Sequence, residues 1–460
     1  MIDWKELQIE NNMKEPIFIT NANIVNEGKI FVADVLIEGG IISSIGKLPL
    51  ASNYKIIDAT GKYLFPGVID AQVHFREPGL THKGDIFSES KAAIAGGVTS
   101  FIDMPNTIPN TLTTEILNEK FSIASEKSLA NYSFFLGVNG KNIDEVIKMD
   151  TSQFIGVSDD GLYFTGKGNL LADNPDTMEK LFSNCKSIIA IHSETEQVIE
   201  KNEKIYKIKY GENIPIECHP LIRNEEACYW ATERAIQLAN KYNARLHVLH
   251  LSTEVETHLF QNNIPLSEKK ITTEVSIHHL WFSDKDYKRL GTLIKWNPAI
   301  KTEKDKIGLL KALLDDRIDI VTTDHAPHTL EEKQKPYLQS MSGAPMVQHS
   351  LNIMLELYKQ GLISLEKIVE KMCHNVAMLY RIEKRGFIRE GYFADLVLVD
   401  LNFSWTVNKE NILYKCGWSP LEGQKFQSTI THTFVNGNLV YENGNFHEFI
   451  PGQRLKFNNQ

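Results

Sequence analysis

Residues 67–106 read GVIDAQVHFREPGLTHKGDIFSESKAAIAGGVTSFIDMPN. Apolar runs of strand length lie at the two ends of this stretch, at 67–75 and 99–106. Between them, residues 84–97 carry apolar side chains at the i, i+3 and i+4 spacing of an amphipathic helix. A strand, a helix and a second strand in this order predict two parallel strands that are joined by a helical crossover.

The same alternation continues through the middle of the chain, to about residue 380. Six further strands are predicted, at 131–138, 154–160, 187–194, 244–252, 271–279 and 318–326. Helical periodicity is clear between several of them, for example at 224–243 and 304–316. Eight strands that alternate with helices predict a (β/α)8 barrel of the TIM type, an α/β fold whose strand ends gather around one mouth.

Both ends of the chain are rich in short strands. Residues 17–46 contain β-branched runs that are broken by turn signals. Near the C-terminus, residues 393–401 predict a strand, and residues 429–442 predict a hairpin around Asn436-Gly437, the strongest short turn signal. We expect both ends to form one small β-sandwich, and the alternative is two unrelated β extensions.

The predicted domain boundaries follow from this pattern. Residues 65–385 form the barrel, which carries the candidate chemistry. Residues 1–64 and 386–460 together form the small β domain. No internal repeat of 20 to 50 residues is visible, so the chain is not a solenoid or a propeller.

The composition excludes several classes of protein. Hydrophobic residues make up 42% and charged residues 23%, which is ordinary for a soluble globular protein, and the formal net charge of −9 argues against nucleic-acid binding. No apolar run approaches the 18 residues of a membrane span, and the polar N-terminus is unlike a secretory signal. The five scattered cysteines contain no CxxC pair and are typical of a reducing compartment. We therefore expect a cytoplasmic protein.

Histidines and aspartates gather at the C-terminal ends of the predicted strands. The positions are His74, Asp159-Asp160, His192, His250 and Asp324, after strands one, four, five, six and eight. Each residue alone is more often a hydrogen-bonded core residue or part of a turn. Their coincidence at one end of five strands predicts a metal site, because imidazole and carboxylate groups bind borderline metals such as zinc.

Other polar residues near these strand ends have less certain roles. Gln72, His74 and Arg76 alternate along one strand, so their side chains point to the same side. His247 is expected to pack or to support a neighbouring ligand. The pair His278-His279 either lines the mouth or has a structural role, and both readings remain open at this point.

Several of these blocks resemble dihydroorotases, which belong to the cyclic amidohydrolase superfamily. The most specific blocks are DAQVHFREPGLTHKGDIFSESKAAIAGGVTSFIDMPNT at 70–107 and VTTDHAPHT at 321–329. AIHSE, HPLIRNEEA, LHVLHLST, KWNPAIK, GYFADLVLVDL and GWSPLEG match in the same order. The resemblance spans about residues 55 to 440, and it implies a metal-bearing barrel with a small β domain built from both chain ends.

The resemblance also implies a role for each matched residue. The implied metal ligands are His74, Asp160, His192, His250 and Asp324, with Asp160 bridging two zinc ions. Asp324 would also be the catalytic proton carrier. The implied substrate-binding residues are Arg76, Asn106, Asn297 and His328, together with backbone groups near Gly343.

One position departs from the family pattern. The family usually has His-x-His after the first strand, and this chain has Gln72-Val-His74. An amide oxygen is a poorer zinc ligand than imidazole, so one zinc is expected to bind tightly and the second weakly. The second site is the one that shares His74 and Asp324, because the Asp160, His192 and His250 set is intact.

The expected activity is the reversible hydrolysis of (S)-dihydroorotate to N-carbamoyl-L-aspartate, a step of pyrimidine synthesis. Two alternatives are a hydantoinase or allantoinase type of cyclic amidase, and a catalytically silent partner of the carbamoyltransferase. Arg76 and Asn106 argue against substrates that lack a ring carboxylate. The expected ligand is thus a small molecule. Neither nucleic acid nor a membrane is expected as a partner. A homodimer is the oligomeric state to test.

Overall fold

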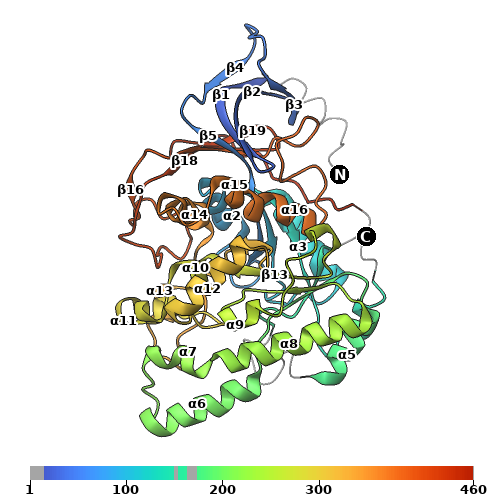
Figure 1. The fold of residues 1–460 in the computed structure, drawn as a ribbon, viewed down its shortest axis with the longest axis vertical. Helices are drawn as coiled ribbons and strands as arrows, with labels where there is room; N and C mark the ends of the chain where they lie inside the picture. The colour runs from blue at the N-terminus through green and yellow to red at the C-terminus, as the bar shows by residue number, and fades with distance from the viewer. Residues whose placement is uncertain (1–14, 150–153, 163–173, 459–460) are drawn as a thin grey trace.

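The computed structural model describes residues 15–149, 154–162 and 174–458 of the 460-residue chain (Figure 1). A ring of parallel strands forms its centre. These strands are β6 (Val68–Val73), β7 (Val98–Asp103), β8 (Asn131–Phe134) with β9 (Leu136–Gly137), β10 (Gly156–Ser158), β11 (Ile188–Ile191), β12 (Leu246–Val248), β13 (Ile271–Ser276) and β14 (Ile320–Thr322). All eight predicted strands are therefore present, and Phe135 alone separates β8 from β9.

The strands are hydrogen-bonded as two parallel sheets, β6-β7-β8 and β9 through β14, which together surround the barrel core. At one seam, the Phe135 backbone N–H donates to the carbonyl of Asp103 at 3.0 Å. At the other seam, Val73 and His325 form a parallel bridge, and the His74 backbone N–H donates to His325 O at 2.8 Å. The first and last strands are thereby adjacent, which brings His74 and Asp324 together.

Helices cover the outside of the strands. Their bounds are α2 (Ile86–Ala95), α3 (Thr114–Lys127), α4 (Ile143–Val146), α5 (Pro175–Asn184), α6 (Glu196–Tyr210), α7 (His219–Ile222), α8 (Glu225–Tyr242), α9 (Glu254–Thr257), α10 (Ile277–Trp281), α11 (Tyr287–Leu290), α12 (Glu303–Leu314), α13 (Leu330–Lys333), α14 (Ser350–Lys359), α15 (Leu365–Val369) and α16 (Asn375–Leu379). Side-chain caps fix several starts: Asp85 accepts from the backbone of Ser88 at α2, and Thr302 accepts from that of Asp305 at α12.

One predicted strand is too long. The expected strand at 271–279 ends at Ser276, and helix α10 begins at Ile277, so His278 and His279 lie on a helix. Ile277 and Leu280 continue the apolar pattern without a break. A short apolar run cannot show by periodicity where a strand gives way to a helix.

The two chain ends form one mixed sheet, at the top of Figure 1. Within the described residues its order is β20-β19-β18-β15-β5-β1-β2-β3, with β4 paired to β1. The bounds are β1 (Ile17–Asn26), β2 (Lys29–Glu38), β3 (Ile41–Gly46), β4 (Lys55–Asp58), β5 (Tyr63–Pro66), β15 (Leu396–Asp400), β18 (Thr429–Val435), β19 (Asn438–Glu442) and β20 (Asn445–Phe446). The N-terminal β5 pairs with the C-terminal β15, so both ends contribute to one β unit as expected, although its described strands hydrogen-bond as a single sheet and not as the two sheets of a sandwich.

The two faces of this sheet have different partners. Leu396 and Leu398 of β15 pack in a separate apolar cluster with residues of β1 and β2. Val397 and Val399 point to the other face and join the main core of the barrel. Alternation along one strand thus attaches the sheet to the barrel through one face only. A two-stranded ribbon, β16 (Trp405–Thr406) with β17 (Lys425–Phe426), lies beyond β15.

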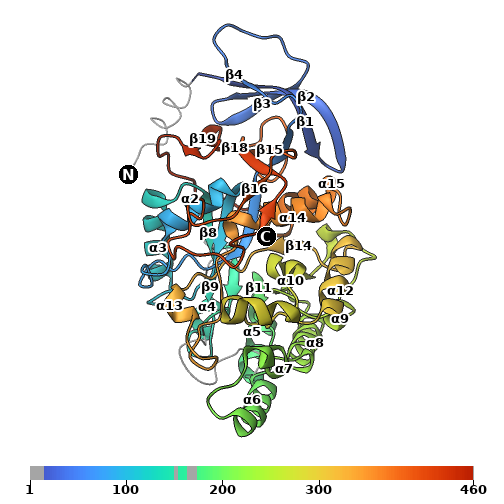
Figure 2. The same cartoon turned by 90° about the vertical axis from the view of Figure 1, so that its left-hand side faces the viewer.

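Helices α6, α7 and α8 lie at the end of the molecule opposite the sheet, as Figures 1 and 2 show. Among the helices of the described residues, none has both the length and the apolar character that a membrane span requires.

Candidate active site

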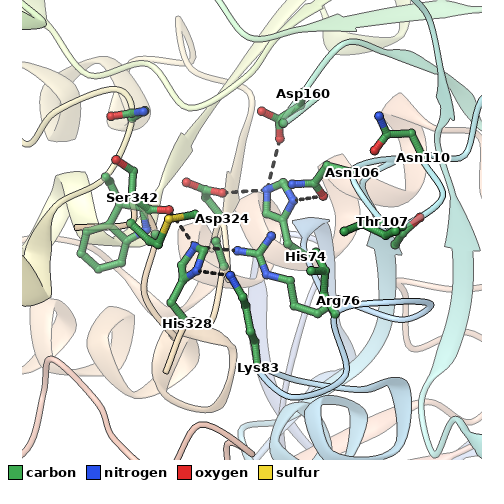
Figure 3. Close-up of a pocket in the computed structure, with 18 residues that line it drawn as sticks. His74, Arg76, Lys83, Asn106, Thr107, Asn110, Asp160, Asp324, His328 and Ser342 are labelled. Atoms are coloured by element: carbon green, nitrogen blue, oxygen red, sulfur yellow. Dashed lines mark hydrogen bonds and ion pairs between the residues drawn. The ribbon is translucent and has the colours of Figure 1, made fainter. Parts of the chain in front are cut away.

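The candidate metal-binding residues lie directly after barrel strands, at the carboxyl end of each. They are His74 after β6, Asp160 after β10, His192 after β11, His250 after β12 and Asp324 after β14. Each has at most 5% of its surface exposed. The carboxyl ends of barrel strands face one mouth, and Figure 3 shows His74, Asp160 and Asp324 pointing toward one another.

Three residues of the mouth have a left-handed backbone. The φ angles are 69° at Arg76, 37° at His250 and 45° at Asp324. Residues other than glycine rarely adopt such φ angles, and the backbone strain costs on the order of 1–3 kcal/mol per residue. Strained residues of this kind cluster at functional sites, where surrounding contacts hold them in place.

Asp160, His192 and His250 form the first group that could hold a metal ion. Nδ1 of His192 lies 3.0 Å from Nε2 of His250. These two nitrogens lie 3.6 and 3.9 Å from Oδ1 of Asp160. Two imidazole nitrogens and a carboxylate oxygen thus converge, which is a donor set that zinc and similar divalent cations prefer.

His74, Asp160 and Asp324 form the second group. Nε2 of His74 lies 3.0 Å from Oδ1 of Asp324 and 3.2 Å from Oδ2 of Asp160. Nδ1 of His74 lies 2.7 Å from Oδ1 of Asn106 and donates to it, which directs Nε2, the nitrogen that would bind a metal ion, toward the two carboxylates. Asp160 contributes one oxygen to each group, so a single carboxylate joins them.

The electrostatics of the cluster favour a bound cation. Burial would lower the pKa of His74, but Asp160 and Asp324 raise it to about 10. Burial would likewise raise the pKa of Asp160, and hydrogen bonds with His192, His250 and His74 hold it well below its ordinary value. Buried carboxylates therefore create a strongly negative potential, and the donor atoms present fit a divalent metal ion.

Gln72 lies in the same cluster and is completely buried. Its Nε2 donates to Oδ2 of Asp160 at 3.3 Å, and its Oε1 accepts from the hydroxyl of Ser276 at 3.5 Å. The amide thus contacts the carboxylate that both groups share. As a neutral amide, it adds no negative charge and only a weakly basic oxygen to the second group.

Two residues that support His192 were missed by the sequence analysis. Nε2 of His192 lies 2.8 Å from Oε2 of Glu194, which also accepts from Arg223. The spacing of His192 and Glu194 by two residues was the available signal, because it places both on one side of the chain. Arg223 lies in the block HPLIRNEEA, which matches the family, but nothing in that block shows that its side chain reaches Glu194. The backbone N–H of His192 donates to Asp159 at 3.0 Å, and Asp160 is the neighbour that joins the donor groups.

A pocket lies against the second group (Figure 3). Its lining includes the five residues that were predicted to hold the substrate, namely Arg76, Asn106, Asn297, His328 and Gly343. Oδ1 of Asn297 and Nε1 of Trp296 are buried without a hydrogen-bond partner among the described residues. Both residues line the pocket, so one donor and one acceptor without a protein partner belong to its wall.

The three histidines with less certain roles, His247, His278 and His279, are not among the described residues that line this pocket. His247 lies in the barrel interior, where its Nε2 is 3.0 Å from Oε2 of Glu274. His278 stacks on Trp296 with ring centroids 4.1 Å apart. These contacts indicate a supporting position for His247 and a place for His278 behind the pocket wall.

The sequence model of the amidohydrolase family matches residues 63–440. The chain belongs to the amidohydrolase family. It is a hydrolase of a metal-dependent family that acts on a small molecule, in agreement with the two donor groups at the barrel mouth.

Curated relatives of this amidohydrolase cover nearly its whole length. A protein of Pyrococcus abyssi named dihydroorotase is 31% identical over 430 residues, which are 93% of this chain and 96% of the relative. A protein of Methanosarcina acetivorans with the same name is 31% identical over 422 residues, which are 88% of each chain.

Solved structures confirm the barrel fold. The L-hydantoinase (dihydropyrimidinase) of Arthrobacter aurescens matches with a TM-score of 0.88 and 26% identity, over 96% of this chain and 99% of that one. The dihydropyrimidinase of Brevibacillus agri matches with a TM-score of 0.85 and 24% identity, over 97% and 100% of the two chains, and shows the fold alone.

Proposed function

We propose that this amidohydrolase is a dihydroorotase, which opens the ring of (S)-dihydroorotate to N-carbamoyl-L-aspartate and closes it in pyrimidine synthesis. Relatives at 31% identity over most of the chain carry that name. Within the structure, the observation that carries the proposal is the place of Arg76 in the pocket.

Arg76 provides a buried cation for a substrate carboxylate. Its side chain is oriented by Nε, which donates to Pro327 O at 3.1 Å. Burial lowers its pKa to about 10, so it remains charged at neutral pH. A planar guanidinium can bind a carboxylate through two parallel hydrogen bonds. A ligand without a carboxylate would leave this charge buried and poorly compensated, which is costly.

The remaining pocket residues suit ring opening. Water adds to the ring amide carbon, the C–N bond breaks, and the leaving nitrogen takes a proton. Asp324 is placed to accept the proton of the water and deliver it to that nitrogen, since it lines the pocket beside His74. A metal ion held by the two groups would supply acidified water and a polarised carbonyl. Asn297 and Asn106 would orient the ring.

The finer assignments belong to the same proposal. The metal is zinc, held tightly by Asp160, His192 and His250 and weakly by the second group, where Gln72 replaces an expected histidine. We place the enzyme in the cytoplasm, and a homodimer is the oligomeric state to test. The domain boundaries at 64/65 and 385/386 are part of this proposal, and they agree with a sheet that draws on both chain ends.

The second candidate is a hydantoinase or dihydropyrimidinase type of amidase. The match to the Arthrobacter aurescens L-hydantoinase favours it, because 96% of this chain aligns with that structure. The third candidate is a silent partner of the carbamoyltransferase, for which the one specific observation is the loss of a histidine at Gln72.

One set of assays separates the three candidates. Purified protein is tested on dihydroorotate, carbamoyl-aspartate, hydantoin and dihydrouracil, with metal analysis of the same sample. We expect turnover of the first two, and a sharp loss in Arg76→Met, which retains bulk without the charge. A charge-assisted contact is worth about 1.5–3 kcal/mol. Preferred turnover of hydantoin would support the second candidate, and no metal with no turnover would support the third.

A further inference from the structure

Lys83 lies beside the substrate-binding residues, although the proposed reaction assigns it no role. It follows the first barrel strand, lines the pocket and has a side chain that is 7% exposed. Its Nζ lies 3.1 Å from Nδ1 of His328 and 2.9 Å from Oε1 of Glu332. Figure 3 shows Lys83 and Arg76 meeting at the His328 ring.

Glu332 is itself held in place. Its Oε2 accepts from the backbone N–H of Thr329 at 3.0 Å, in the capping box at the start of α13. The carboxylate therefore has a fixed position, and it favours the ammonium form of Lys83 at 2.9 Å. An ammonium group donates hydrogen bonds and accepts none. Nδ1 of His328 must then be the acceptor.

The other ring nitrogen of His328 gives the same answer independently. Nε2 lies 3.0 Å from the carbonyl oxygen of Ser342, which can only accept. The proton of a neutral imidazole therefore resides on Nε2. The ring is neutral because burial and the nearby charge of Arg76 hold the pKa of His328 well below its ordinary value.

This tautomer determines what Arg76 can do. Nη2 of Arg76 lies 3.2 Å from Nε2 of His328. Both atoms carry protons in this tautomer, so the guanidinium cannot donate to the ring. The Nη2 donors of Arg76 are thus left for a ligand in the pocket, while Nε is held by Pro327.

We propose that Lys83 is a positioning residue, which fixes the Nε2-protonated tautomer of His328 and thereby keeps Arg76 free to bind the carboxylate of the substrate. The inference rests on the proposed function for the identity of that carboxylate. Without Lys83, the carbonyl of Ser342 is the remaining contact that keeps the proton on Nε2, and Oε2 of Glu332, 3.7 Å from Nδ1, competes for that proton at the other ring nitrogen. With the proton on Nδ1, Nε2 accepts a hydrogen bond from Arg76. His328 then competes with the substrate carboxylate for the same donors of Arg76.

The test reads the tautomer directly. Long-range proton–nitrogen NMR correlations of 15N-histidine-labelled, metal-loaded protein distinguish protonated from unprotonated ring nitrogens. His328→Gln identifies the signals of His328. The wild type is expected to show a protonated Nε2 and an unprotonated Nδ1. The opposite tautomer, or a doubly protonated ring, would overturn the proposal even if no variant could be studied.

Three lysine variants complete the test. Lys83→Met should shift the tautomer and raise KM for dihydroorotate by about ten- to a hundredfold, with kcat and bound metal little changed. Lys83→Arg retains the cation, so the tautomer of His328 and the KM for dihydroorotate should both stay close to those of the wild type. Lys304→Met breaks a 3.0 Å pair with Glu254 on an exposed lysine and should change neither. Thermal unfolding shows whether each variant is folded.

The remaining outcomes distinguish a failure of the Lys83 proposal from a failure of the proposed function. A higher KM with an unchanged tautomer would mean that Lys83 acts as a charge on the substrate, and an unchanged KM would mean that it does not act at all. Wild-type protein without turnover would refute the proposed function. The tautomer and the Kd for orotate, measured by calorimetry, would still test Lys83, because orotate presents the same carboxylate.

Discussion

The type of residue at position 72 is expected to determine whether the site holds one metal ion or two. Gln72 is completely buried and donates to the carboxylate of Asp160, which both donor groups share. Gln72→His would replace a neutral amide by an imidazole nitrogen next to His74, Asp160 and Asp324. We expect metal content, measured by mass spectrometry after dialysis, to rise toward two per chain. Two ions that survive a chelator in the unmodified protein would contradict this reading.

Asp324 offers a second test at the residue scale. Asp324→Asn keeps the shape of the side chain but cannot accept a proton. Turnover of dihydroorotate should fall by about 10²–10⁴-fold, the usual contribution of a general acid–base group. The group of Asp160, His192 and His250 is left intact, so one bound metal and a folded protein are expected. A variant with near-normal kcat would show that another group carries the proton.

The sequence predicted the residues of the pocket better than their connections. Arg76, Asn106, Asn297, His328 and Gly343 all line it, and their role in binding the substrate stays a prediction. Lys83 was missed, because its contact with His328 joins positions that are 245 residues apart. Such a contact depends on the closure of the barrel between its first and last strands, and no local pattern records it.

At the scale of elements, one buried lysine holds the segment that follows α13. Nζ of Lys333 donates to the carbonyls of Lys295 at 3.1 Å, Met341 at 2.8 Å and Gly343 at 2.7 Å. Lys333→Met would leave the carbonyls of Met341 and Gly343 without this partner, at about 1–3 kcal/mol each, while Lys295 O keeps the backbone N–H of Gly343 at 2.8 Å. We expect a lower Tm and a higher KM, because the segment lines the pocket.

The matched control is Lys335→Met, two residues further along and exposed. It removes the same charge from the same segment without touching those carbonyls. Equal effects of the two substitutions on Tm and KM would show that net charge, rather than the cage of carbonyls, is responsible.

Elements were predicted with correct type and order but with approximate ends. The helix expected at 224–243 is α8 (Glu225–Tyr242), since Asn224 caps its start and Asn243 ends it in a left-handed conformation. The strand expected at 244–252 is only Leu246–Val248. The residues beyond it stay buried but leave the regular strand conformation at the barrel mouth, where His250 has a φ of 37°. Hydrophobicity continues past that point, so the pattern alone overestimates the strand.

At the scale of the whole molecule, the barrel and the terminal sheet are joined by a buried polar cluster. Asp395, just before β15, accepts from Arg385, from Asn131 Nδ2 of barrel strand β8 at 3.1 Å and from the backbone of Asn436 at 2.7 Å. All four residues are at most 5% exposed. The sequence predicted that both chain ends share a domain, but it could not show this cluster, whose members come from distant parts of the chain.

Asp395→Asn should therefore destabilise the whole molecule, although it lies outside the pocket. The substitution leaves the guanidinium of Arg385 buried without its carboxylate, and breaking a buried pair in this way costs about 3–5 kcal/mol. We expect a clearly lower Tm in calorimetry, while the KM of the protein that remains folded is unchanged. Asp144→Asn is the control, because its partner Lys180 is on the surface and solvent screens such pairs. If both variants unfolded at the same temperature as the wild type, Asp395 would not couple the sheet to the barrel.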